Sequence, residues 1–151
     1  MINCIKSKNR GFTFVEILAV LAIITSLTTV VILSFNSLGG RQSLDKTSIS
    51  VISILNEARS MAMSSKDFSN YGVRISTGSI ISFKNNYGNE NRVFELPNLV
   101  NISDINISSD IIFNKLSGDT NATGTFSVFL KKNPLKKVVI RISNTGLVEK
   151  I

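Results

Sequence analysis

Hydrophobic residues are concentrated near the start of the chain. Between Phe12 and Phe35 most residues are apolar, and the 19 residues 17–35 carry no charge. At a rise of roughly 1.5 Å per residue, a helix of this length extends about 28 Å, close to the hydrocarbon thickness of a bilayer. We therefore predict a single membrane-spanning helix over residues 12–35.

The next segment has the period of an amphipathic helix. Its apolar positions recur at spacings of three and four residues: Ile52, Leu55, Ala58 and Ala62. Polar residues separate them, which is typical of a helix with one buried face. We predict a stem helix over residues 44–64 that packs this stripe on a sheet of the same chain. Binding of a partner helix is the alternative.

Gly39 and Gly40 lie between these two helical segments. Each glycine destabilises a helix by about 1 kcal/mol relative to alanine, because the unfolded glycine backbone has more conformational freedom to lose. We expect a break or a bend at this pair.

Beyond Lys66 the pattern changes to alternation, with β-branched and aromatic residues between turn signals. The predicted strands lie in seven stretches: YGVRIS, SIISFKN, NRVFELP, IIFNK, TFSVFLKK, KKVVIRIS and LVEKI. Thr77-Gly78 favours a hairpin between the first two, and NPL (residues 133–135) separates the fifth from the sixth. With roughly six to eight short strands, the predicted fold is α+β: a long N-terminal helix packed on an antiparallel sheet or small sandwich.

The composition argues against metal, thiol and enzymatic chemistry. The chain has no histidine, and its one cysteine, Cys4, has no partner for a disulfide. Zinc sites and general bases at neutral pH depend mainly on histidine and cysteine. Asp104, Asp110 and Asp119 show no catalytic spacing to a base or nucleophile. We predict solvated loop carboxylates, no cofactor, no metal site and no enzyme.

Positive charge precedes the apolar run. Of the 17 cations that contribute to the net charge of +7, Lys6, Lys8 and Arg10 lie before it. Such charges hold an N-terminus in the cytoplasm. A cleaved secretory signal shares the basic start, but its apolar stretch is only about 7–15 residues long and ends at a small-residue cleavage site. We predict a retained single-pass anchor with the rest of the chain outside the cytoplasm.

Glu16 is the only formal charge within the predicted span. A charged side chain at the centre of a bilayer is penalised by about 2.5–3.5 kcal/mol on insertion scales, and by less near the end of a span. Glu16 therefore either lies at the level of the lipid headgroups or requires a positively charged partner.

The stretch RGFTFVEILAVLAII (residues 10–24) resembles the processing site of type IV prepilins and type II secretion pseudopilins. The shared features are a basic leader, a glycine, a phenylalanine, a glutamate four positions later and a long apolar helix. The resemblance implies that prepilin peptidase cleaves between Gly11 and Phe12 and methylates the Phe12 amine. It also implies that Glu16 pairs with the N-terminal amine of a neighbouring subunit, which would neutralise two charges in an apolar filament core.

The C-terminal half is similar to H-type minor pseudopilins and FimT-like minor pilins. The similarity lies in four stretches: LNEARSMAMSS, GVRI, IIFNKLSGDTNATGTFSVFL and VVIRISNTGLVEKI. It implies a minor structural subunit of a type II secretion pseudopilus or type IV pilus, anchored in the bacterial inner membrane. The expected partners are the peptidase, other subunits, the inner-membrane assembly platform and membrane lipid. The implied parts are a leader (1–11), a span (12–35), a stem (36–66) and a β-rich domain (67–151).

Five basic residues cluster toward the C-terminus: Lys131, Lys132, Lys136, Lys137 and Arg141. On adjacent strands they would form one positive patch, which can hold DNA phosphates without reading sequence. FimT-like minor pilins are associated with DNA uptake, so a DNA-binding minor pilin for natural transformation is the alternative function. Lysines on an edge strand also discourage sheet-to-sheet pairing, which is a purely structural explanation.

Overall fold

The computed structural model describes residues 11–88, 91–107 and 110–151, with the side chains of residues 33–38 excepted. Most of the predicted leader, including Cys4 and its three cations, lies outside the described residues. The chain divides into two compact units, Met1–Leu38 and Gly39–Ile151. We call the second one the globular unit and describe each unit by itself.

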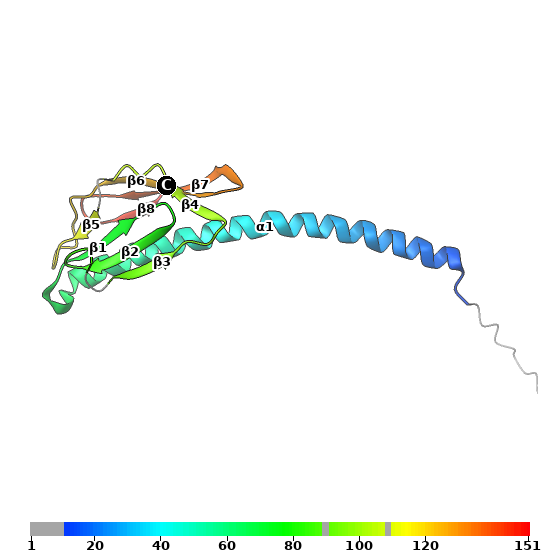
Figure 1. Ribbon diagram of the computed structural model, residues 1–151, viewed down its shortest axis with the longest axis horizontal. Coiled ribbons are helices and arrows are strands. Elements are labelled where there is room, and N and C mark those ends of the chain that lie inside the picture. Colours follow the sequence, from blue (N-terminus) through cyan, green and yellow to red (C-terminus); the bar gives the residue numbers. More distant parts are fainter. Residues whose placement is uncertain (1–10, 89–90, 108–109) are drawn as a thin grey trace, which may run out of the picture. The chain divides into compact units, whose positions relative to one another are not determined.

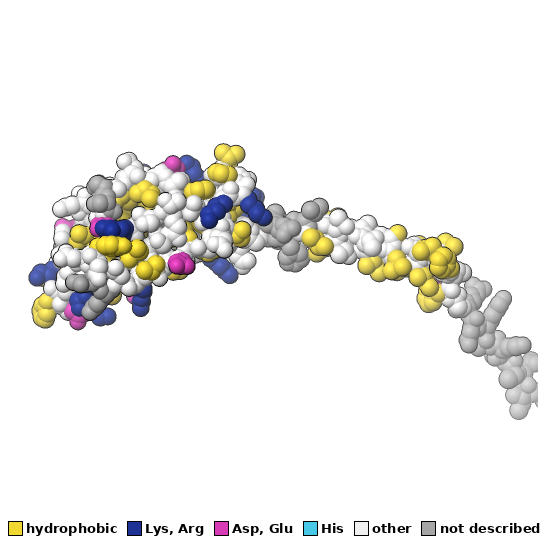
Figure 2. All heavy atoms as spheres, in the orientation of Figure 1, with side chains coloured by type: hydrophobic (Ala, Val, Ile, Leu, Met, Phe, Trp, Pro, Cys, Tyr) yellow, Lys and Arg dark blue, Asp and Glu magenta, His cyan; other side chains and the backbone are white. Residues whose placement is uncertain are grey.

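The first unit consists of the N-terminal part of helix α1, which is assigned over Phe14–Met63. Its segment Phe14–Ile32 has a mean hydropathy of 2.4, and none of it is buried within the protein. Figure 2 shows hydrophobic side chains along this segment, whereas lysines and arginines lie on the globular unit. A helix with this much exposed apolar surface is long and apolar enough to cross a membrane.

Four hydroxyl residues interrupt the apolar surface of this segment, and each donates a hydrogen bond to a carbonyl about one turn earlier: Thr25, Ser26, Thr28 and Thr29. An unsatisfied hydroxyl in an apolar medium is costly. Because the helix supplies its own acceptors, these hydroxyls are compatible with a lipid environment.

The helical backbone continues through Gly39 and Gly40, so the expected break is not observed. A β-carbon at Gly39 would meet nothing within 4 Å, and one at Gly40 would lie 3.5 Å from Leu130 Cδ1, an ordinary contact. The helical penalty of two glycines is about 2 kcal/mol. Burial of a single large apolar side chain is worth about 1.5–3 kcal/mol, and several such residues follow on the stem.

The stem part of α1 packs a regular stripe into the core of the globular unit. Its buried apolar residues are Leu44, Val51, Leu55, Ala58 and Ala62. Three of the four predicted stripe positions are in this set, while Ile52 lies beside it and is partly buried. Thr47 and Ser48 complete the buried face, and the Ser48 hydroxyl donates to the Leu44 carbonyl at 2.8 Å. The predicted amphipathic helix is confirmed, and it packs on the sheets of its own chain.

In the described part of the chain, α1 is followed by a short 3-10 helix, η1 (Lys66–Phe68), and by eight strands. The first sheet has the order β3-β2-β1-β5 and the second has the order β4-β6-β7-β8, with every pair antiparallel (Figure 1). The bounds of the first sheet are β1 Tyr71–Ile75, β2 Ser79–Lys84, β3 Arg92–Glu95 and β5 Asp110–Phe113. Those of the second are β4 Val100–Ser103, β6 Gly124–Leu130, β7 Asn133–Ile142 and β8 Val148–Lys150. One cluster of buried residues joins both sheets to the stem.

The α+β class, the hairpin at Thr77-Gly78 and the number of strands are confirmed. Strand β4 was not predicted, because asparagines, serines and an aspartate around Val100 and Ile102 look like turn signals. Both apolar residues are nonetheless buried at alternate positions.

The predicted turn NPL (residues 133–135) is wrong. These residues begin β7, and the turn consists of Lys131 and Lys132, since Leu130 pairs with Asn133. Pro134 is tolerated at the start of a strand, where its missing N–H removes little from the ladder.

Candidate functional site

The predicted processing site lies immediately before α1. Gly11, Phe12 and Thr13 are not helical, and the Phe12 side chain is 81% exposed. A β-carbon at Gly11 would meet nothing within 4 Å, so this glycine has no packing role among the described residues. The peptide bond between Gly11 and Phe12 is therefore in an accessible, non-helical segment, as a peptidase requires.

The start of α1 fixes the position of Glu16. Thr13 caps the helix, because its Oγ1 accepts a hydrogen bond from the Glu16 N–H at 3.3 Å. Glu16 is then the third helical residue, where the N–H groups of the first turn favour a negative charge. Together with Phe12, Val20 and Leu21, it borders an apolar surface hollow of about 300 Å³. Among the described residues none forms an ion pair with Glu16.

The three aspartates that were predicted to be solvated loop acids each have a structural partner. Asp110 begins β5 and receives two hydrogen bonds from the Arg74 guanidinium, at 2.6 and 2.7 Å. Asp104 pairs with Lys137 at 3.3 Å, and the Lys137 ammonium is the main reason that the pKa of Asp104 lies below its usual value.

Asp119 accepts hydrogen bonds from Ser117 and Asn114, and the Ser117 bond is the main reason that its pKa is lowered. Within the described ranges no three acidic, histidine or cysteine side chains form a group that could hold a metal ion. The aspartates fix loops rather than meeting in one site.

The five basic residues are not on one face of the second sheet. Lys131 and Lys132 are exposed in the β6–β7 turn. Lys137 and Arg141 alternate with the buried residues of β7 and face away from the core, whereas Lys136 falls on the opposite side of the strand. Arg141 pairs across the ladder with Glu149. The continuous patch expected from the sequence is therefore divided, and two of its charges lie beside acids.

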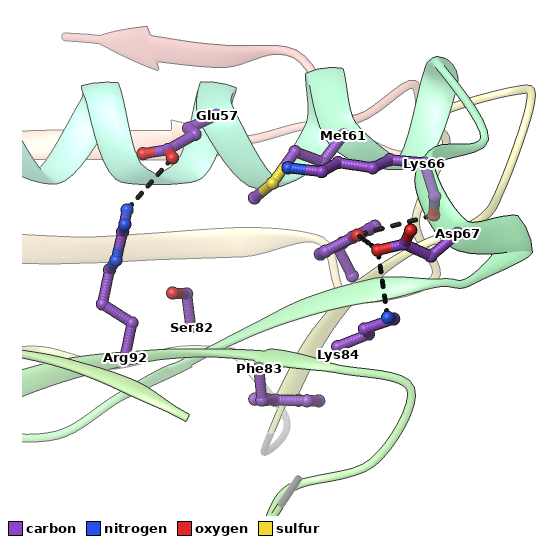
Figure 3. Close-up of a pocket in the computed structure, with 9 residues that line it drawn as sticks. Glu57, Met61, Lys66, Asp67, Ser82, Phe83, Lys84 and Arg92 are labelled. Atoms are coloured by element: carbon purple, nitrogen blue, oxygen red, sulfur yellow. Dashed lines mark hydrogen bonds and ion pairs between the residues drawn. The ribbon is translucent and has the colours of Figure 1, made fainter. Parts of the chain in front are cut away.

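A polar pocket of about 230 Å³ lies between the end of the stem helix and the first sheet (Figure 3). Glu57 and Met61 line it from the helix, and Lys84 and Arg92 line it from β2 and β3. Arg92 Nη1 donates to Glu57 Oε1 at 3.2 Å, which joins β3 to the stem. No sequence motif marks this pocket, because its residues come from five separate elements: α1, η1, β1, β2 and β3.

Asp67 is the most connected charge in this pocket. Its Oδ2 accepts hydrogen bonds from Lys84 Nζ at 3.0 Å and from the Tyr71 hydroxyl at 3.4 Å (Figure 3). These bonds, that from Lys84 above all, lower the pKa of Asp67. Asp67 of η1 and Lys84 of β2 are thus held together in a structural network.

Comparison with known proteins gives two findings. Residues 6–32 match the family described as the prokaryotic N-terminal methylation motif. The minor pseudopilin EpsH from the type II secretion system of Vibrio cholerae has a similar crystal structure, with a TM-score of 0.55 and 13% identity over 73% of this chain and 94% of that chain. The chain carries a prepilin N-terminal methylation motif and has the fold of a minor pseudopilin. No protein of curated function matches the sequence.

The predicted resemblance is confirmed at both ends of the chain. The methylation motif contains Gly11, Phe12 and Glu16 within its matched residues, and the pseudopilin fold agrees with the stem and sheets of the globular unit. Both findings support a type IV pilin or pseudopilin of the H type.

Proposed function

We propose that this chain is a minor subunit of a type II secretion pseudopilus or type IV pilus, and that it acts by assembly rather than by catalysis. The observation that carries the proposal is the methylation motif at residues 6–32, which includes the apolar helical segment Phe14–Ile32 and precedes a pseudopilin-like globular unit. The precursor inserts into the bacterial inner membrane with its basic N-terminus in the cytoplasm and its globular unit outside.

Prepilin peptidase then cleaves between Gly11 and Phe12 and methylates the new amine. The exposed, non-helical position of this bond supports the step. After cleavage the chain begins one residue before the Thr13 cap, so its amine is next to the first turn of α1. The leader cations are lost, and the membrane helix is ready for extraction by the assembly platform.

Glu16 supplies the charge for docking. In lipid an isolated carboxylate is costly, and the described part of the chain offers it no ion pair. The amine of a neighbouring subunit would neutralise it, and the pair would become more favourable as lipid is replaced by packed helices. The same helix serves first as a membrane anchor and then as part of the filament core.

Intact-mass measurement tests the proposal most directly. The full chain is expressed in cells with and without prepilin peptidase, and its N-terminus is sequenced by mass spectrometry. With the peptidase we expect an N-methylated Phe12 terminus, and without it the Met1 precursor. A Gly11→Val variant, with a branched side chain at the cleaved bond, should remain unprocessed in both. Retention of Met1 in the presence of an active peptidase would contradict the proposal.

A further inference from the structure

The turn after the stem helix holds an aromatic side chain in solvent. Phe68 is 87% exposed, and its backbone is left-handed, with φ of 52°. Ser65 and Asp67 have φ of 51° and 54°. Left-handed backbone is unfavourable for any residue with a β-carbon, and a bulky residue there is an outlier. Three such residues within four positions raise the free energy of this turn. Because Phe68 is exposed, its burial does not compensate for that strain.

Hydrogen bonds hold this turn in one conformation. The Phe68 N–H donates to the Ser65 carbonyl at 2.9 Å, and the Ser69 hydroxyl donates to the Asp67 carbonyl at 2.8 Å. The Asp67 carboxylate is held by Lys84 and Tyr71 on the first sheet. The backbone at Phe68 is therefore held in place before any partner arrives, which reduces the backbone entropy lost on binding.

A second loop places apolar side chains at the same end of the globular unit. Leu116, which follows β5, is 71% exposed and also left-handed, and Met63 at the end of α1 is 46% exposed. The Leu116 N–H donates to the Ala62 carbonyl at 3.0 Å, and the Lys115 N–H donates to Asn70 Oδ1 at 3.0 Å. The two loops are thus bonded to each other and to the helix end. We call Met63, Phe68 and Leu116 the distal knob.

The charges around the distal knob are mainly positive. Lys66 and Lys115 are exposed close to Phe68 and Leu116 in the chain. The acids of the two loops are already engaged, Asp67 by Lys84 and Asp119 by Ser117 and Asn114. A complementary surface therefore has an apolar pocket that accepts an aromatic ring and a rim that carries carboxylates.

We propose that the distal knob docks into such a pocket, apolar with an acidic rim, on the globular domain of a different filament subunit. This inference rests on the proposed function. A single projecting aromatic in a fixed turn suits a pocket better than a bilayer surface. The pocket in Figure 3 on a second copy of this chain is not such a receptor, because it is polar and its acids, Glu57 and Asp67, already pair with Arg92 and Lys84.

Site-specific cross-linking in assembled filaments tests the contact. The chain has one cysteine, Cys4, which leaves with the leader, so Phe68→Cys creates a single reactive thiol in the mature protein. Leu135→Cys is the matched control, since Leu135 is 93% exposed in β7 and is not part of the distal knob. Both variants are labelled with a photoreactive maleimide in cells that assemble the filament.

We expect the Phe68→Cys probe to cross-link to one distinct filament subunit roughly an order of magnitude more often than the Leu135→Cys probe. Equal yields, adducts only with lipid, or adducts only with the same chain would overturn the proposal.

A second variant separates binding from folding. Asparagine tolerates left-handed backbone better than phenylalanine does, so Phe68→Asn should keep or raise the melting temperature. Its incorporation into filaments should fall roughly tenfold or more if Phe68 is a binding anchor. Normal incorporation would refute the contact alone, whereas absence of the wild-type chain from filaments would refute both the contact and the proposed function.

Discussion

The α-carbon of Gly146 lies so close to the carbonyl oxygen of Gly118 that a β-carbon on Gly146 would be only 2.0 Å away from it. The Arg59 side chain holds these two loops against the stem helix. Its Nε donates to the Gly118 carbonyl at 3.3 Å, and its Nη2 donates to the Thr145 carbonyl at 3.0 Å. One stem residue thus fastens the β5–β6 and β7–β8 loops, and with them both sheets, to the helix.

Replacing Gly146 should therefore disrupt this junction. In Gly146→Ala the new methyl group meets the Gly118 carbonyl and Arg59 Nε, and the backbone φ of 74° is unfavourable for alanine. We expect a loss of about 2 kcal/mol or more of unfolding free energy. Chemical unfolding of the full chain in detergent measures it. Gly78→Ala is the control, because its β-carbon meets nothing within 4 Å, and equal losses in both variants would contradict the explanation.

The sequence predicted those elements whose local pattern agrees with their tertiary environment. The stem stripe was recognisable because Leu55, Ala58 and Ala62 are buried at the spacing of one helix face. No break is observed at Gly39-Gly40, because local propensity is a weak force beside the core packing that begins at Leu44, whereas a bend there stays a prediction.

The candidate site was predictable only where it is contiguous in the sequence. Gly11, Phe12 and Glu16 form a linear motif, so their pattern was visible. The distal knob and the polar pocket combine segments that only the fold brings together, as the hydrogen bond between Lys115 and Asn70 shows. The basic cluster had the right residues, but alternation along β7 separates Lys136 from Lys137 and Arg141.

Alanine at Gly39 should stabilise the helix. Its β-carbon would meet nothing within 4 Å, and the backbone there is helical, so only the entropy of the unfolded chain changes. We expect Gly39→Ala to gain about 0.5–1 kcal/mol in unfolding free energy, measured by circular dichroism in detergent. Gly39→Pro should instead lose helix signal, because proline removes a backbone donor and clashes with the preceding turn. A loss of stability in Gly39→Ala would show that a helical break is the preferred state.

Acid should weaken the turn that presents Phe68. The pKa of Asp67 is lowered in the folded state, chiefly by Lys84, so the unfolded chain takes up a proton first as pH falls. The stabilisation is complete above the usual aspartate pKa of about 3.9 and is lost below it. We expect the melting temperature to stay constant from about pH 5 to 8 and to decline below about pH 4. The decline should be smaller in Lys84→Met than in the wild type. If Lys84→Met and the wild type lose melting temperature equally in acid, the ion pair of Asp67 with Lys84 is not the cause of the decline.

The lysines of β7 are expected to protect a sheet edge rather than to hold DNA. Strand β8 pairs with Ile140–Ile142, so among the described residues the earlier part of β7, with Lys136 and Lys137, has no partner strand on that side. A Lys136→Thr, Lys137→Thr double variant should self-associate more strongly in analytical ultracentrifugation, because charge no longer opposes strand pairing. Its DNA affinity, measured across salt concentrations, should equal that of the wild type. A steep salt dependence that the double variant loses would support the DNA-binding alternative instead.

The role of Glu16 is tested by separating insertion from assembly. Glu16→Ala removes the only charge of the apolar segment, so membrane insertion and cleavage after Gly11 should be at least as efficient as in the wild type. Incorporation into filaments should fall by roughly tenfold or more, because the amine of the neighbouring subunit is left without a counter-charge.

Thr13→Ala is the matched control for the start of the helix. It removes the cap at Glu16 N–H and costs about 1 kcal/mol of helix stability, but it leaves the carboxylate in place. We therefore expect Thr13→Ala to assemble far better than Glu16→Ala when both are scored by immunoblot of sheared filaments. If the two variants assemble equally, geometry at the helix start rather than charge pairing determines docking. If Glu16→Gln, which keeps the shape but not the charge, assembles normally, an ion pair with the amine is not the driving interaction.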